Sequence, residues 1–367
     1  MKIICSGADL SEAASKVLRA ASAKGLSPIL EGIKLATDGS FLVLTATDSE
    51  LSIQTRIVSS TLVEGATVVP GKIFCEFVKK LVANQIEISV DTNNRMHLKY
   101  QDNVGQLACM SVSEYPDIYQ LSSSQEFVII KSEFKDLINK VEFCCSSDDS
   151  RPILKGVYLD IDDHSITAVA LDGYRLAKSV KAVEKTTSKF NAVVPKKSLT
   201  EMVRLIDDST EPLKVQIQKN YIMVDLGHTK ITSRLLEGEF INYKQIIPTS
   251  SNSTVIVGKE QMEDSLERAG LLAKVDKSNL VKFDISGNTL EVSCNSDMGN
   301  ISEKLNVKLD GVEIKVAFNG NYFIALLKVL HTQNIVIKFI NATSPAVILP
   351  GGSSDDTMFL VLPVRLN

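Results

Sequence analysis

The sequence predicts an α+β protein made of three tandem copies of one domain, each with two helices on one face of antiparallel sheet. Three observations predict this fold: internal repeats at one spacing, strands with alternating apolar residues, and amphipathic helices at matching places in the copies. The chain has 367 residues, of which 44% are hydrophobic and 23% charged. The chain is longer than a typical domain with a single hydrophobic core, and its composition is that of an ordinary soluble globular protein.

The repeat is visible in short matching stretches such as "PILEGIKL" and "PILKGVYL". The matching pairs stand 124 or 125 positions apart and in the same order: Pro28 and Pro152, Asp48 and Asp172, Pro70 and Pro195, Glu114 and Glu239. A fainter third copy continues at this spacing. We therefore expect domains at 1–124, 125–250 and 251–367, with serine-rich stretches at the two joins.

Each copy is expected to open with a short strand and an amphipathic helix, in which Asp9 and Glu12 have the spacing of a capping box in the first copy. Alternating strands follow, and then Val-Val-Pro leads into a second helix. The inner face of that helix in the first copy is expected to hold Ile73, Phe74, Phe77 and Leu81. Further strands close the domain.

The stretch "VALDGYRLAKS" (169–179) predicts two strands joined by a tight turn at Asp172-Gly173, because this dipeptide tolerates positive φ. Tyr174, Arg175 and Leu176 follow the turn. We expect them to present a ring, a guanidinium and an apolar side chain at the lip of a groove. Such a lip suits an apolar peptide with a polar handle.

Charge is unevenly distributed along the chain. The net charge is −4, yet the six predicted helices together carry more Lys and Arg than Asp and Glu. The polar faces of the second helices repeat one pattern, with Lys72, Glu76 and Lys79 in the first copy and Lys197, Glu201 and Arg204 in the second. These faces are either solvated surfaces with internal ion pairs or a basic surface that contacts phosphates without reading bases.

The motifs "RPILKGV", "ALDGYRLA", "EGEFINYKQIIP" and "FLVLPVRL" together resemble the bacterial DNA polymerase sliding clamp family, the beta subunit of the replicative polymerase. The resemblance covers the whole chain in order. It implies three DNA-clamp domains that close, as a head-to-tail homodimer, into a ring around duplex DNA with the helices inside. The resemblance also implies that the chain is a non-catalytic processivity factor that has no cofactor and is a subunit of the DNA polymerase III holoenzyme.

The resemblance further implies partners and a peptide-binding pocket between the second and third domains. The expected partners are duplex DNA of any sequence, the replicative polymerase catalytic subunit, the clamp loader, and repair and translesion polymerases. The expected pocket walls are Arg151, Leu154, Leu171, Gly173, Tyr174, Arg175, Leu176, Ile241, Ile246, Leu362, Pro363, Val364 and Arg365. Leu176 and Leu362 also fit a plain core role.

Three pocket positions depart from the family pattern. Leu171 stands where a small residue or Thr is common, Tyr174 where His is frequent, and Ile241 where Pro is usual. These departures leave the peptide preference open. The expected DNA-facing residues are Lys24, Lys72, Lys196 and Lys197, and the expected dimer interface joins the strand around Leu107 to Leu271 and Leu272.

Other classes of protein are weighed against this one. The sequence has no GxxxxGK[ST], GxGxxG or HExxH motif, and its four histidines are scattered. Asp148 and Asp149 could hold a divalent ion or simply be solvated, and a hydrolase site assembled only by folding stays open. A monomeric three-domain peptide-binding scaffold that does not encircle DNA is the main alternative.

Cysteine usage and the N-terminus bear on the compartment. Six cysteines without a CxxC pair are expected to be reduced core residues, with a redox role of the vicinal pair Cys144-Cys145 as the alternative. The first residues contain no apolar segment of the secretory type, and no apolar run approaches the roughly 18 residues of a membrane helix. We therefore expect a cytoplasmic protein without membrane contact, and the resemblance to sliding clamps implies that it is associated with the nucleoid.

Overall fold

The computed structural model describes residues 1–22, 27–81, 84–119, 125–274, 279–352 and 356–365. The chain forms two compact units, each built around one antiparallel sheet. Unit 1 comprises Met1–Lys131, Glu184–Thr187 and Lys197–Leu235. Unit 2 comprises Ser132–Val183, Ser188–Lys196 and Leu236–Asn367. No helix in the described ranges is long and apolar enough to cross a membrane.

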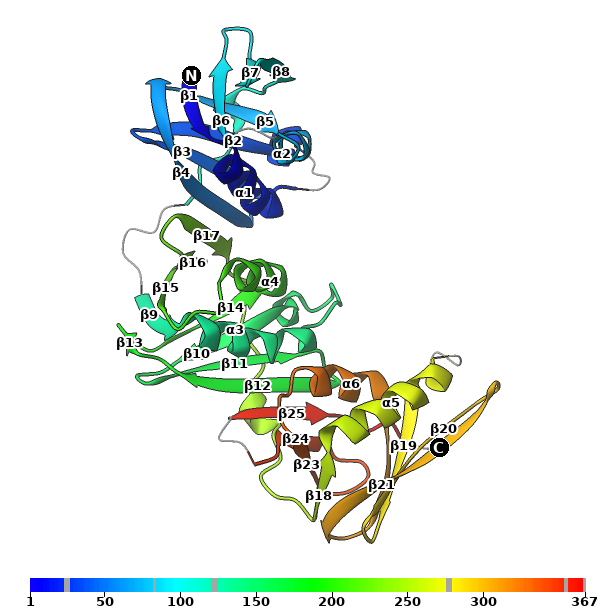
Figure 1. Ribbon diagram of the computed structural model, residues 1–367. Helices are drawn as coiled ribbons and strands as arrows, with labels where there is room; N and C mark the ends of the chain where they lie inside the picture. The colour runs from blue at the N-terminus through cyan, green and yellow to red at the C-terminus, as the bar shows by residue number, and fades with distance from the viewer. Residues whose placement is uncertain (23–26, 82–83, 120–124, 275–278, 353–355, 366–367) are drawn as a thin grey trace. The chain divides into compact units, whose positions relative to one another are not determined.

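The sheet of unit 1 has 13 strands. Its members are β1 (Lys2–Ser6), β2 (Gly32–Asp38), β3 (Phe41–Thr47), β4 (Leu51–Val63), β5 (Ala66–Pro70), β6 (Gln85–Val90), β7 (Arg95–Tyr100), β8 (Asn103–Ala108), β9 (Gln125–Ile130), β13 (Lys185–Thr186), β15 (Pro212–Gln218), β16 (Tyr221–Asp225) and β17 (Thr229–Arg234). Helices α1 (Gly7–Val17) and α2 (Gly71–Lys79) pack against each other beside this sheet, as Figure 1 shows.

The sheet of unit 2 has 12 strands. Its members are β10 (Gly156–Ile161), β11 (Ser165–Leu171), β12 (Arg175–Ala182), β14 (Phe190–Pro195), β18 (Ser253–Gly258), β19 (Leu280–Ser286), β20 (Thr289–Ser296), β21 (Gly299–Gly311), β22 (Ile314–Asn319), β23 (Asn334–Phe339), β24 (Ala346–Pro350) and β25 (Thr357–Val361). Helices α5 (Lys259–Ala273) and α6 (Gly320–Lys328) pack together in this unit. The remaining helices are α3 (Lys131–Asn139) and α4 (Lys196–Leu205).

Both sheets run across the boundaries of the sequence repeats. In unit 1, β4 of the first repeat pairs with β17 of the second, and in unit 2, β12 of the second repeat pairs with β25 of the third. Strand pairing across a boundary covers edges that would otherwise be exposed. The compact units therefore do not follow the repeats that the sequence shows.

The start of α1 differs from the prediction. Ser6, rather than Asp9, is the N-cap, because its hydroxyl accepts a hydrogen bond from the Asp9 N–H at 3.3 Å. Asp9 lies in the first turn instead, where a carboxylate is favourable near the helix N-terminus.

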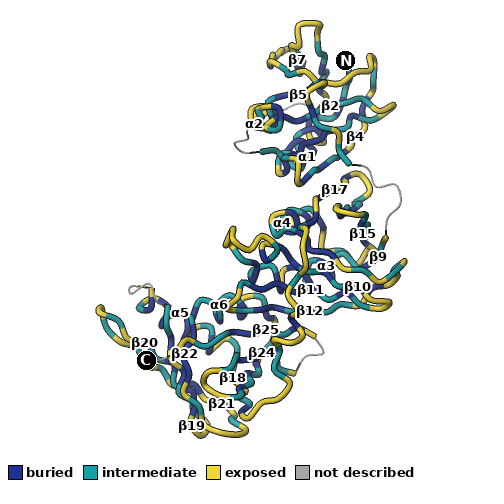
Figure 2. The backbone as a smooth tube through the Cα atoms, turned by 180° about the vertical axis from the view of Figure 1, so that it is seen from behind, coloured by how far each residue is buried: buried dark blue, intermediate teal, exposed yellow. Residues whose placement is uncertain are grey.

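The buried face of α2 is also rotated from the predicted one. It consists of Phe74, Cys75 and Val78, whereas Ile73 is 58% exposed. Gly71 allows the close approach of the helix start, since a Cβ there would lie 2.7 Å from the Glu31 carbonyl oxygen. Figure 2 shows that the buried backbone follows the strands and the inner sides of the helices, while most turns are exposed.

Five of the six cysteines are buried, as the sequence predicts, whereas Cys109 is half-buried. All six are free thiols, and Cys144 and Cys145 are both buried. Burial raises the pKa of the Cys144 thiol strongly and that of Cys145 to about 12. Because the thiolate is the reactive form, a redox role for this pair is disfavoured.

Candidate functional site

The turn at Asp172-Gly173 forms as the sequence predicts and joins β11 to β12. The Asp172 carboxylate accepts hydrogen bonds from the N–H groups of Tyr174 at 2.9 Å and Arg175 at 3.0 Å. Gly173 has a φ of +95°, which a residue with a Cβ adopts only with strain. Together these interactions fix the backbone from which Tyr174 projects.

The Arg175 side chain is held by the protein itself. Its Nε donates to the Asp172 carboxylate at 2.9 Å, and its Nη2 donates to the Phe143 carbonyl at 2.9 Å. Its guanidinium carbon also lies 5.5 Å from the centre of the Phe143 ring and 4.7 Å from that of Tyr322. Arg175 therefore acts as a brace for the turn.

Beneath the turn lies an apolar floor. The buried cluster contains Leu154, Val169, Leu171, Leu176, Tyr243 and Leu360. Leu176 is 2% exposed, because it faces Leu360 across the β12–β25 pair. Leu176 thus belongs to the core and forms part of the floor of the groove, not its lip. This agrees with the alternative interpretation, in which Leu176 has a plain core role.

The exposed part of the predicted pocket surrounds that floor. Tyr174 is 62% exposed, and its ring stacks on Tyr322 with centroids 6.5 Å apart. The C-terminal stretch runs beside the turn, since the Leu362 N–H donates to the Tyr174 carbonyl at 2.9 Å. The other exposed members are Arg151, Gly173, Ile241, Ile246, Val364 and Arg365, and Leu362 and Pro363 are half-buried. All thirteen predicted pocket residues lie in unit 2.

Sequence reasoning missed five residues of this site: Phe143, Val169, Tyr243, Tyr322 and Leu360. Tyr243 is buried in the floor, and burial together with the nearby Asp160 raises its pKa to about 12. A signal for it existed, because Tyr243 falls within "EFINYKQI", one of the repeated stretches. Phe143 and Tyr322 come from other elements and no motif marks them.

The predicted DNA-facing lysines have different surroundings. Lys72 is exposed on α2 and Lys196 is half-buried, whereas Lys24 lies outside the described residues. Lys197 is exposed but forms an ion pair with Asp48. Burial opposes ionisation of Asp48, yet hydrogen bonds from the Leu51 N–H, Lys197 and the Glu50 N–H outweigh it and lower the pKa of the carboxyl.

Other basic side chains on the helices are also paired. Lys16 lies 2.6 Å from Glu12 on α1, and Glu201 on α4 binds both Arg19 and Arg204, at 3.2 and 2.8 Å. Ion pairing within the helix faces is therefore real. Exposed ion pairs of this kind contribute little to stability, so they hold these side chains only loosely.

The predicted interface residues lie at two kinds of surface. Leu107 is half-buried on β8, which stands at the end of the strand order of its sheet. On α5, Leu271 is 70% exposed and Leu272 is half-buried. Leu271 is thus accessible for contact with another molecule, as the predicted interface requires, although isolated apolar side chains are common on protein surfaces.

The structure also bears on the enzymatic alternative. The described part of the chain holds no group of three or more His, Cys, Asp or Glu residues that could bind a metal ion. Asp148 accepts hydrogen bonds from the N–H and hydroxyl of Ser150 at 2.9 and 2.7 Å, and Asp149 pairs with Lys155. Both carboxylates are thus engaged locally.

Known protein families match this chain over nearly its whole length. Three family models match in order: the DNA polymerase III beta subunit N-terminal domain over 1–119, its central domain over 128–242 and its C-terminal domain over 244–365. The fold is therefore three tandem clamp domains of the α+β class, as the sequence predicts.

Individual relatives agree with the family models. The chain is 32% identical over 363 residues to the beta sliding clamp of Halalkalibacterium halodurans, with 95% of each chain covered. It is 28% identical over 366 residues to that of Streptococcus pneumoniae, with 97% of each covered. The crystal structure of the Bacillus subtilis DNA polymerase sliding clamp matches with a TM-score of 0.97 and 28% identity over 100% of both chains. The chain belongs to the DNA polymerase III beta subunit family of sliding clamps.

Proposed function

We propose that this chain is a non-catalytic processivity factor, a sliding clamp that encircles duplex DNA and tethers polymerases to it. The observation that carries the proposal is the match of all three beta subunit domains, in order and over nearly the whole chain. No single motif would support as much, because one domain of this type does not make a ring.

We infer that two copies associate head to tail and that each of six domains turns the ring by about 60°, since heterologous contacts close when their rotations sum to a full turn. The exposure of Leu271 and the terminal position of β8 support such a joint. Exposed lysines such as Lys72 support sequence-independent contact with phosphates.

The apolar floor and the turn at Asp172-Gly173 support a groove for short apolar peptides, which we call the peptide groove. Tyr174 supplies an exposed aromatic wall, and the C-terminal stretch beside it supplies a second wall. Such grooves bind short linear segments through a few anchoring side chains. The proposed clients are the replicative polymerase, the clamp loader, and repair and translesion polymerases, at the nucleoid in the cytoplasm.

Retention on DNA tests the clamp function. After loading onto closed circular DNA, the protein should remain bound at high salt and should run off once the same DNA is cut. Loss from closed and cut DNA at equal rates would contradict encirclement.

Native mass then separates the clamp from the monomeric scaffold. The scaffold predicts 40.1 kDa, and the ring predicts twice that mass.

A further inference from the structure

A groove in unit 1 occupies the same place in its sheet as the proposed peptide groove occupies in unit 2. Ser52 faces Thr232 across β4 and β17, as Leu176 faces Leu360 across β12 and β25. Ser52 and Leu176 are separated by 124 positions, which is the spacing of the sequence repeat. The two pairs are therefore equivalent.

Buried hydroxyl pairs confirm that the two backbone frames correspond. Thr55 and Thr229 are hydrogen-bonded at 2.9 Å in unit 1, and Ser179 and Thr357 are hydrogen-bonded at 3.0 Å in unit 2. Each pair follows the facing residues above by three positions along β4 or β12. The backbone arrangement of β4 and β17 is thus repeated in β12 and β25, and the two grooves differ in the side chains that line them.

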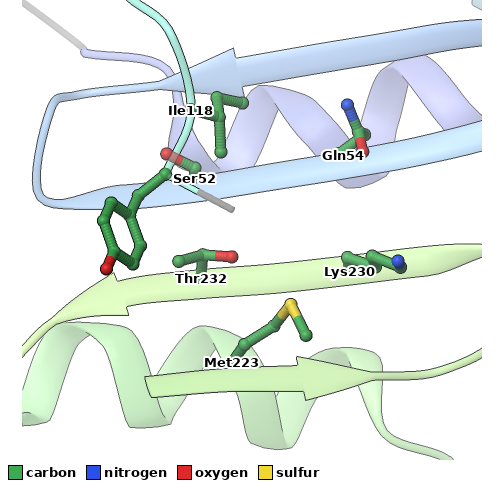
Figure 3. Close-up of a pocket in the computed structure, with 7 residues that line it drawn as sticks. Ser52, Gln54, Ile118, Met223, Lys230 and Thr232 are labelled. Carbon is green, nitrogen blue, oxygen red and sulfur yellow. The ribbon is translucent and has the colours of Figure 1, made fainter. Parts of the chain in front are cut away.

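The groove in unit 1 is hollow (Figure 3). A cavity of about 210 Å³ adjoins a second of about 420 Å³, and the two share Ser52, Ile118, Tyr119 and Thr232. The rings of Tyr119 and Tyr221 stack with centroids 4.2 Å apart at the second cavity. The residues that line the first cavity are Ser52, Gln54, Ile118, Tyr119, Met223, Lys230 and Thr232.

Five of the seven residues that line the first cavity carry a polar group, in contrast to the leucines of unit 2. Lys230 is the one charged residue among those of the first cavity, and its Nζ lies 3.9 Å from the Asp225 carboxylate, a long ion pair. Thr232 is 7% exposed, and its hydroxyl has no hydrogen-bond partner among the described residues. A leucine anchor would leave the Thr232 hydroxyl without a partner and would add nothing to the long ion pair of Lys230, whereas an anionic oxygen would accept a hydrogen bond from both groups.

We propose that this groove, the polar groove, binds a short peptide segment through an Asp or Glu side chain. The carboxylate sits between the Thr232 hydroxyl and the Lys230 ammonium, and a neighbouring aliphatic side chain packs on Met223 and Ile118. Figure 3 shows Lys230 and Gln54 at one end of the cavity and Thr232 and Ser52 further along. The site does not depend on the peptide groove of unit 2.

The test uses the full-length protein with labelled methionine methyl groups and the peptide acetyl-Ser-Glu-Leu-Glu-Ser-amide. The Met223 methyl signal, assigned with Met223→Leu, should shift on titration and saturate. The matched peptide with Gln in place of both Glu residues should bind roughly tenfold more weakly, because charge-assisted hydrogen bonds are the stronger ones.

Two near-isosteric variants locate the carboxylate. Thr232→Val and Lys230→Met should each weaken the acidic peptide roughly tenfold, while Leu176→Ala in unit 2 should leave its binding unchanged. Thermal unfolding of each variant confirms that it is folded. No shift of Met223, equal binding of the Gln peptide, or binding unaffected by Thr232→Val and Lys230→Met would each overturn the proposal.

Discussion

The guanidinium of Arg175 lies over the ring of Tyr322, with 4.7 Å between its central carbon and the ring centre. Tyr322 stands on α6 and also stacks on Tyr174. One tyrosine therefore supports both residues that follow the turn at Asp172-Gly173. Its phenol is partly buried beside Asp172, and burial first and this carboxylate second raise its pKa.

Arg175→Lys should loosen the turn while keeping the charge. An ammonium cannot reproduce the two directed bonds to Asp172 and Phe143, so we expect a loss of about 1–3 kcal/mol in the free energy of unfolding. A Gln-Leu-x-Leu-Phe peptide should also bind more weakly in calorimetric titration. Arg204→Lys, on an exposed ion pair, is the matched control and should change neither quantity. Wild-type values for Arg175→Lys would show that the brace is dispensable.

Deletion of residues 362–367 should abolish binding of the same peptide. It removes the backbone N–H groups of Leu362 and Val364, which donate to the carbonyls of Tyr174 and Ala317. The truncated protein should remain dimeric, because the proposed interface lies elsewhere. Calorimetry measures the affinity, and binding retained after deletion would place the peptide groove elsewhere.

Leu176→Ala should weaken the peptide less than the deletion does, by about 1–3 kcal/mol. Because Leu176 is buried floor, this variant should also lose about 2–5 kcal/mol of the free energy of unfolding. Chemical denaturation and titration of the same sample separate the two effects. An unchanged free energy of unfolding would contradict the floor position of this side chain.

The double change Leu271→Ala and Leu272→Ala should shift the protein toward monomer. Leu271 is largely exposed in the single chain, so its loss should cost the fold little and the interface more, on the order of 2–5 kcal/mol if well packed. Native mass at nanomolar concentration measures this. Val58→Ala, at another exposed apolar residue, is the control and should stay dimeric.

Replacement of Lys24, Lys72, Lys196 and Lys197 by Ala should weaken DNA binding whatever the base sequence. The affinity for DNA should also depend less steeply on salt concentration, because a protein that makes fewer phosphate contacts releases fewer counterions on binding. Lys197 is paired with Asp48, so Lys197→Ala alone should have a smaller effect than Lys72→Ala alone. Salt titrations of binding to duplex DNA decide this, and an unchanged slope in the quadruple variant would rule these lysines out as phosphate contacts.

The buried thiols of Cys144 and Cys145 should make stability fall at high pH. Their pKa values are raised in the folded state, above about 8.5 for an unfolded thiol, so folding favours the neutral form. This contribution is complete below pH of about 8.5 and is lost as the pH rises toward the folded values. A Cys144→Ala, Cys145→Ala variant should lose less stability than wild type between pH 8 and 10 in urea unfolding. Parallel losses in the two proteins would contradict this linkage.

Much of the fold could be predicted because it depends on local signals that repeat. Short stretches of sequence predict the turn at Asp172-Gly173, the strand before it and the spacing of the copies. What could not be predicted depends on packing between distant segments. Tyr322 and Phe143 reach Arg175 from separate elements, and the buried face of α2, which leaves Ile73 exposed, packs on α1 and beside β2 and β5.

The polar groove illustrates the same limit. No sequence motif marks Ser52 or Thr232. Their place in one groove is evident only from the strand register, which sets them opposite each other. The repeat spacing then shows that Leu176 holds the equivalent place. Sequence reasoning found the repeat but had no means to pair β4 with β17.

The pairing of β4 with β17, and of β12 with β25, has a consequence for synthesis on the ribosome. Each earlier strand leaves the exit tunnel roughly 170 residues before the strand that will cover it. At the usual ~5–20 residues per second, its edge waits on the order of ten to thirty seconds without a partner. The nascent chain therefore presents open strand edges twice during translation, and each is a natural point of engagement for chaperones.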